Sequence, residues 1–99
     1  MSFPKPTKRR KKAIHITKII RQSVMERDNG QCQLCNKQAT QLHHILFKSY
    51  GGADISQNLI SLCNECHIKV HSHGKKYFNI LLKLQQRHYP EITKEDLKR

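Results

Sequence analysis

The sequence predicts a small α+β domain that bound metal holds together, and two observations support this prediction. Two Cys-x-x-Cys pairs, Cys32 with Cys35 and Cys63 with Cys66, lie in a chain of 99 residues. The apolar residues between and after these pairs are spaced as in short strands and amphipathic helices. A chain of this length buries too little apolar surface to be more than marginally stable, and a metal site is a common remedy.

The charge of the chain indicates a polyanionic partner. Nineteen Lys and Arg residues against seven Asp and Glu residues give a net charge of +12. Contacts with phosphates release condensed counterions, so we favour nucleic acid over an anionic lipid surface or simple solubility. No apolar run reaches the roughly 18 residues of a membrane span, and none resembles the apolar core of a signal peptide. We therefore expect a cytoplasmic protein that does not associate with membranes.

Residues 1–16 have the composition of a disordered basic arm, which leaves residues 17–99 for the folded domain. The arm contains prolines and an uninterrupted basic run, Lys8, Arg9, Arg10, Lys11 and Lys12. We expect this run to contact phosphates without sequence preference. A solvated tail and a nuclear-localisation signal are the alternative interpretations of the same run.

The first expected helix starts after Thr17, which is a good N-cap residue. Apolar residues spaced four apart, including Val24, form its buried face, and Gly30 ends it as the C′ residue. Arg21 and Arg27 lie off that face, so we expect them to be surface charges.

A hairpin and two further helices follow the first cysteine pair. We expect strands over residues 41–47 and 58–62, joined by a loop in which Gly51-Gly52 supplies positive φ. A helix over residues 64–72 ends at Gly74, and a second amphipathic helix covers residues 75–88. Thr93 and Asp96 have the spacing of a capping box for a last short turn.

The cysteines have the spacing of a structural zinc site. Thiolates at positions i and i+3 can face one ion, and two such pairs complete a tetrahedral Zn²⁺ site closed to water. The hairpin between the pairs can bring them together, and the absence of a secretory signal disfavours disulfides. We expect zinc on Cys32, Cys35, Cys63 and Cys66. A competing ligand set uses His67 with three of the cysteines.

Histidines in the hairpin and after the second cysteine pair can form a separate, open metal site. His43 and His44 are neighbours on a strand and point to opposite faces, whereas His67 and His71 share one face of a helix. One strand histidine and one or both helix histidines can bind a divalent cation such as Mg²⁺ or Mn²⁺. The other strand histidine stays available as a general base, and Asn58 can accept a hydrogen bond that fixes its tautomer.

Together, His-His-Ile, Gly-Gly, Asn-Leu and Leu-Cys-x-x-Cys-His resemble the HNH nuclease family, which has the ββα-metal fold. The resemblance covers about residues 27–71 and is particularly close to small stand-alone members from phages. It implies that His43 and His67 bind the catalytic cation, that His44 is the general base and that Asn58 orients His44.

The same resemblance implies the remaining roles and the activity. His71 matches a further cation ligand of some members, and the four cysteines match the structural zinc of the cysteine-containing branch. Phe47 departs from the proline of many members, which affects the shape of the loop. The implied activity is metal-dependent endonuclease cleavage of DNA, with a phage terminase as partner in genome packaging. The alternatives are a non-catalytic zinc module that binds nucleic acid and an adaptor that recruits a packaging motor.

Overall fold

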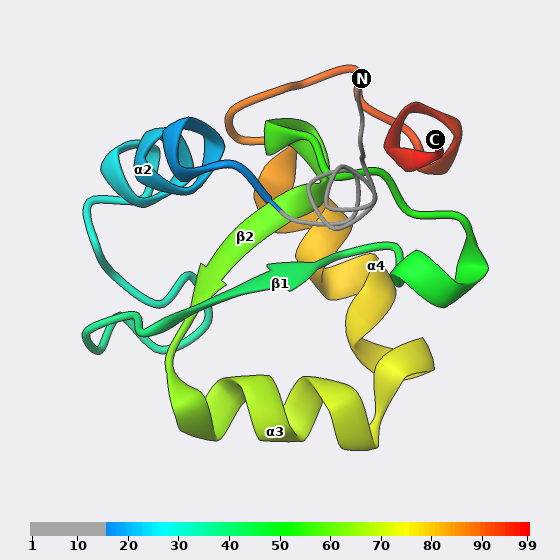
Figure 1. Cartoon of the computed structure of the whole chain (residues 1–99). Coiled ribbons are helices and arrows are strands. Elements are labelled where there is room, and N and C mark those ends of the chain that lie inside the picture. Colours follow the sequence, from blue (N-terminus) through cyan, green and yellow to red (C-terminus); the bar gives the residue numbers. More distant parts are fainter. Residues whose placement is uncertain (1–15) are drawn as a thin grey trace, which may run out of the picture.

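The structure of the chain is a computed structural model that describes residues 16–99. An antiparallel sheet of two strands, β1 (Gln41–His44) and β2 (Leu59–Leu62), lies at its centre. The helices packed around it are α2 (Lys18–Arg27), α3 (Asn64–Ser72) and α4 (Gly74–Gln85) (Figure 1). The α+β class and the ββα order of β1, β2 and α3 confirm the prediction. The basic run Lys8, Arg9, Arg10, Lys11 and Lys12 lies outside the described residues.

Helix α2 begins as predicted, but it ends on a different residue. The Thr17 hydroxyl accepts a hydrogen bond from the amide three residues further on, at 3.1 Å. At the other end, the amide of Asn29 donates to the carbonyl of Glu26 and the amide of Gly30 to that of Met25. This is a Schellman motif, and Asn29 is its C′ residue with a φ of 57°. Gly30, which we predicted at C′, is the following residue.

The strands are shorter than predicted, since β1 ends at His44 and β2 begins at Leu59. His43 pairs with Ile60 and His44 with Leu59. Asn58 does not belong to β2; it ends a 3-10 turn, η2 (Ser56–Asn58). Every residue of β2 is buried, including Ser61, so this strand is covered on both faces.

The core lies between the sheet and the helices, and α4 covers much of it. Leu81 of α4 is fully buried, as predicted for the apolar face of that helix. A last 3-10 turn, η3 (Lys94–Leu97), adds Leu97, and the predicted capping box of Thr93 and Asp96 is present. In the described part of the chain, no helix has both the length and the apolar character needed to cross a bilayer.

The loop between the strands is packed against the rest of the molecule. Gly51 has a φ of +90°, as predicted, whereas Gly52 is needed for a different reason. A Cβ atom on Gly52 would overlap the carbonyl of Leu46, because the middle of the loop folds back against its beginning. The amide of Ala53 donates to the carbonyl of Leu97 at 2.8 Å, which connects η3 to this loop.

The prediction that Arg27 is a surface charge is wrong. Its guanidinium donates to both carboxylate oxygens of Asp28 at 2.9 and 3.0 Å, and Asp28 is buried. The same guanidinium donates to the carbonyls of Ser56 and Leu59 at 2.9 and 2.7 Å. The second Asp28 oxygen also accepts the amide of Ser61 at 3.0 Å. This buried ion pair therefore fixes α2 to η2 and β2.

Candidate functional site

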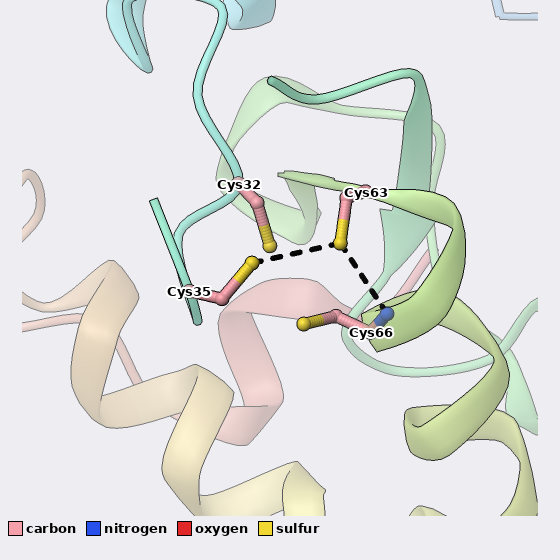
Figure 2. Close-up of side chains that lie close together, drawn as sticks. All are labelled: Cys32, Cys35, Cys63 and Cys66. Carbon is pink, nitrogen blue, oxygen red and sulfur yellow. Dashed lines mark hydrogen bonds between the residues drawn. The ribbon is translucent and has the colours of Figure 1, made fainter. Parts of the chain in front are cut away.

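The cysteine thiols gather at one point, where the turn after α2 meets the start of α3. Figure 2 shows Cys32, Cys35, Cys63 and Cys66 directed toward a common centre, and their sulfur atoms lie within 4.8 Å of one another. The Sγ atoms of Cys35 and Cys63 are 3.6 Å apart. Two thiolates bound to one tetrahedral zinc at about 2.3 Å lie about 3.8 Å apart, so the thiols fit Zn²⁺.

Local backbone structure supports the thiols. Cys63 is the N-cap residue of α3, and its sulfur accepts the amide of Cys66 at 3.4 Å. Amides at a helix N-terminus favour a negatively charged ligand. In the turn that holds Cys32 and Cys35, the amide of Cys32 donates to the carbonyl of Lys37 at 2.6 Å. Asn36 has a φ of 69°, which closes this turn.

The crowded thiols shift one another's proton affinity. Burial raises the pKa of Cys66, and its three cysteine neighbours raise it further. Burial also acts to raise the pKa of Cys32, but hydrogen bonds from the backbone of Cys63 and Cys35 outweigh it and lower the value to about 7. A divalent cation at the centre removes this mutual repulsion and allows all the thiols to ionise.

A second cluster of metal-binding atoms is made by histidines. One ring nitrogen each from His43, His67 and His71 lies within 4.8 Å of the others, and the Nε2 atoms of His67 and His71 are 3.2 Å apart. Two nitrogens bound to one ion at about 2.1 Å, at angles near 90–110°, lie about 3.0–3.4 Å apart. His67 therefore belongs to this cluster, which disfavours the ligand set of three cysteines and His67.

The buried member of this cluster lacks a hydrogen-bond partner. His43 is 2% exposed, and within residues 16–99 its Nε2 is the buried side-chain polar atom without a partner. Buried polar groups are almost always satisfied, so this orphaned nitrogen fits a metal ligand. Burial, with smaller contributions from the neighbouring histidines, lowers the pKa of His43 to about 3. Burial likewise lowers the pKa of His67. Both rings are thus neutral near pH 7, the form that binds metal.

Helix α3 connects the two clusters. Cys66 and His67 are consecutive residues, and His71 follows one turn later on the same face as His67. Because the thiol cluster fixes the N-terminus of α3, it also sets where the helix histidines meet β1. The His43 ring centroid lies 5.3 Å from those of both His67 and His71.

His44 has a carboxylate partner that sequence reasoning missed. Its Nε2 lies 2.7 Å from Oδ1 of Asp54, and Nζ of Lys48 lies 3.2 Å from Oδ2. Burial acts to raise the pKa of Asp54, but the hydrogen bonds from His44 and Lys48 outweigh it and hold the pKa below its usual value. The ionised carboxylate accepts the Nε2 proton, which leaves the lone pair on Nδ1. The sequence did contain one indication of this pair, because Asp54 is the sole carboxylate between His44 and Asn58.

Asn58 does not form the expected hydrogen bond with His44. Its carboxamide is fully buried and closes the hairpin loop instead. Oδ1 accepts the amide of Leu46 at 2.8 Å, and Nδ2 donates to the carbonyls of Leu46 and Ala53, each at 3.0 Å. Asn58 precedes β2 and points back into the loop, so any effect on His44 runs through the loop that carries Asp54.

The histidine cluster and His44 open into one cavity. This cavity of about 270 Å³ is lined by His43, His44, His67 and His71, together with residues that include Lys48 and Phe47. Consecutive strand residues point to opposite faces, but β1 ends at His44, where the chain turns into the loop. The imidazoles of the cluster and the His44–Asp54 pair can therefore act on one bound group.

Comparison with known proteins agrees with this geometry. Residues 32–73 match the family model of the HNH endonucleases. A curated relative, the type IV methyl-directed restriction enzyme EcoKMcrA of Escherichia coli (strain K12), is 29% identical over 63 residues. That alignment covers 54% of this chain and 23% of the restriction enzyme, so the chain spans less than a quarter of its relative. The matched segment contains the paired strands, α3 and both metal-binding clusters. Residues 32–73 are therefore an HNH endonuclease domain.

Proposed function

We propose that the chain is a metal-dependent endonuclease that hydrolyses phosphodiester bonds in DNA. The observation that supports this most directly is the shared cavity, in which His44 lies beside the cluster of His43, His67 and His71. A general base next to an open divalent-cation site is the minimum that phosphodiester hydrolysis requires.

In this proposal each cluster has one task. The cysteines hold a structural Zn²⁺, which fixes α3, and His43, His67 and His71 hold one catalytic cation such as Mg²⁺ or Mn²⁺. When bound, that cation supplies Lewis-acid stabilisation of the charge on the phosphodiester and on the departing 3′ oxygen.

His44 and Asp54 move the proton. Nδ1 of His44 accepts a proton from the water that attacks phosphorus, and the bond from phosphorus to the 3′ oxygen breaks. The departing 3′ oxygen takes a proton from solvent, so the products are a 5′ phosphate and a 3′ hydroxyl. The ionised Asp54 at Nε2 fixes the tautomer and stabilises the imidazolium that forms. Asn58 acts indirectly, because it closes the loop that carries Asp54.

The remaining parts of the proposal concern partners. The net charge of +12 and the basic run in residues 8–12 suit non-specific contact with the DNA backbone. Action with a phage terminase during genome packaging, in the host cytoplasm, rests on the resemblance to small phage proteins alone.

The test is a supercoiled-plasmid assay across divalent metals, with His44→Ala beside the wild type. We expect nicking in Mg²⁺ or Mn²⁺, a loss of about 10²–10⁴-fold in rate for His44→Ala, and unchanged DNA binding. His73→Ala is the matched control, because His73 is exposed at the junction of α3 and α4, outside both clusters. If wild type fails to cleave in every metal, the endonuclease proposal is wrong and the zinc module that binds nucleic acid is the better account.

A further inference from the structure

A second hollow lies next to the catalytic cavity, and the proposed hydrolysis does not use it. This groove of about 460 Å³ lies between the loop after β1, the end of α3, the start of α4 and η3. Its lining includes Phe47, Tyr50, His71, Lys75, Phe78 and Lys94. Phe47 and His71 also line the catalytic cavity, so the two hollows adjoin and share part of their walls.

Three nearly parallel rings lead from the histidine cluster into this groove. The rings of His71 and Phe47 stack with centroids 5.3 Å apart at an angle of 21°. Phe47 and Tyr50 then stack with centroids 6.0 Å apart at 7°. Tyr50 is the outermost ring and is 73% exposed, so the series ends on an aromatic surface that another planar ring can extend.

The charges around the groove suit a nucleotide. Lys75 and Lys94 contribute to its lining, in which residues 16–99 place no Asp or Glu. Nζ of Lys94 lies 5.8 Å from the ring centroid of Phe78. Aromatic platforms combined with cationic side chains are how proteins hold single-stranded nucleic acid, because every base has a face that stacks and every phosphate is anionic.

We propose that this groove binds an unpaired nucleotide adjacent to the scissile phosphate, with its base stacked on Tyr50. The proposal rests on the endonuclease function and specifies its substrate as DNA with a single-stranded or splayed segment at the cut. Bases inside a duplex are covered on both faces by their neighbours, so only an unstacked base can extend the series of rings. Because the groove adjoins the catalytic cavity at Phe47 and His71, a base held there lies next to the reacting phosphate.

The test measures binding in a background that does not cleave. His44→Ala and His44→Ala/Tyr50→Ala are compared by fluorescence anisotropy on a labelled single strand of about 12 nucleotides and on a blunt duplex of the same sequence. Loss of the stacking platform should weaken binding to the single strand by about 5- to 150-fold and leave duplex binding nearly unchanged. Tyr50→Phe should retain single-strand binding, because it keeps the ring.

The control is Ile19→Ala in the same background, since Ile19 is 80% exposed on α2 and takes no part in the groove. The proposal is overturned if Tyr50→Ala binds the single strand within twofold of its parent, or if it loses as much affinity for the duplex. The anisotropy measurement does not depend on cleavage. If the plasmid assay shows no cleavage, the endonuclease proposal is wrong, and the anisotropy comparison still decides separately whether Tyr50 holds an unpaired base.

Discussion

Asn58→Ala separates a loop-closing role from direct contact with the catalytic base. The substitution removes the hydrogen bonds to Leu46 and Ala53 in a position that is fully buried. Each such bond contributes about 0.5–1.5 kcal/mol, so we expect the free energy of unfolding to fall by about 2–4 kcal/mol. Cleavage should also fall, because the loop positions Asp54.

The matched comparison is Asp54→Ala. Asp54 is partly exposed, and its ion pair with Lys48 should contribute no more than about 1 kcal/mol to stability. Its effect should instead be on rate: loss of the partner of His44 should lower kcat by about 10- to 100-fold, the range found when the hydrogen-bond partner of a metal-bound imidazole is removed. The assays are urea unfolding of the zinc-loaded proteins and plasmid cleavage under one set of conditions.

The two variants should therefore change different measured quantities. Asn58→Ala should mainly lower the urea midpoint, and Asp54→Ala should mainly lower kcat with an almost unchanged midpoint. If Asn58→Ala shifts stability by less than about 0.5 kcal/mol, within the range of an ordinary surface substitution, its carboxamide does not close the loop as described. If Asp54→Ala cleaves at the wild-type rate, the pairing with His44 has no catalytic role.

Three further predictions concern the clusters and the ion pair. Cys66→Ser should release zinc and also abolish cleavage, because α3 carries ligands of both sites; chelator-based zinc counting checks this, and zinc retained near one equivalent would contradict it. Arg27→Ala should cost about 3–5 kcal/mol in urea unfolding by removing the guanidinium paired with the buried Asp28, which keeps His88 at 3.6 Å and the Ser61 amide, whereas the exposed Arg21→Ala should cost less than about 0.5. The pKa of the His43 side chain is lowered to about 3 in the folded protein, below its value in the unfolded chain. The stability that the neutral ring contributes is therefore complete above the pKa of the unfolded chain and declines as the solution is acidified. Without a catalytic cation, unfolding free energy should fall below about pH 6.5 by up to about 1.4 kcal/mol per pH unit, and His43→Phe should flatten that slope.

The sequence predicted the metal-binding groups because their chemistry imposes local spacing. A Cys-x-x-Cys pair must form a tight turn to bind one ion, and histidines at i and i+4 must share a helix face whatever surrounds them. His67 and His71 could therefore be paired before the fold was known. The first and last caps, at Thr17 and Thr93, were predictable for the same reason.

The contacts that sequence reasoning missed are those set by loop closure. Asp54 meets His44 across ten residues of irregular chain, and no periodicity encodes that distance. Asn58 was expected at the base, but the close approach of Gly52 to Leu46 draws its carboxamide into the loop. Arg27 lies off the apolar positions of α2, so the sequence places it at the surface. Its burial depends on carbonyl groups about thirty residues further along the chain.

The most direct test of the two-site account is a calorimetric titration of the zinc-loaded protein with Mn²⁺. We predict about one further ion per chain, bound by His43, His67 and His71, in a site that His43→Ala removes and His73→Ala leaves intact. Absence of binding beyond the zinc, or binding that His43→Ala does not weaken, would contradict a separate catalytic cation site.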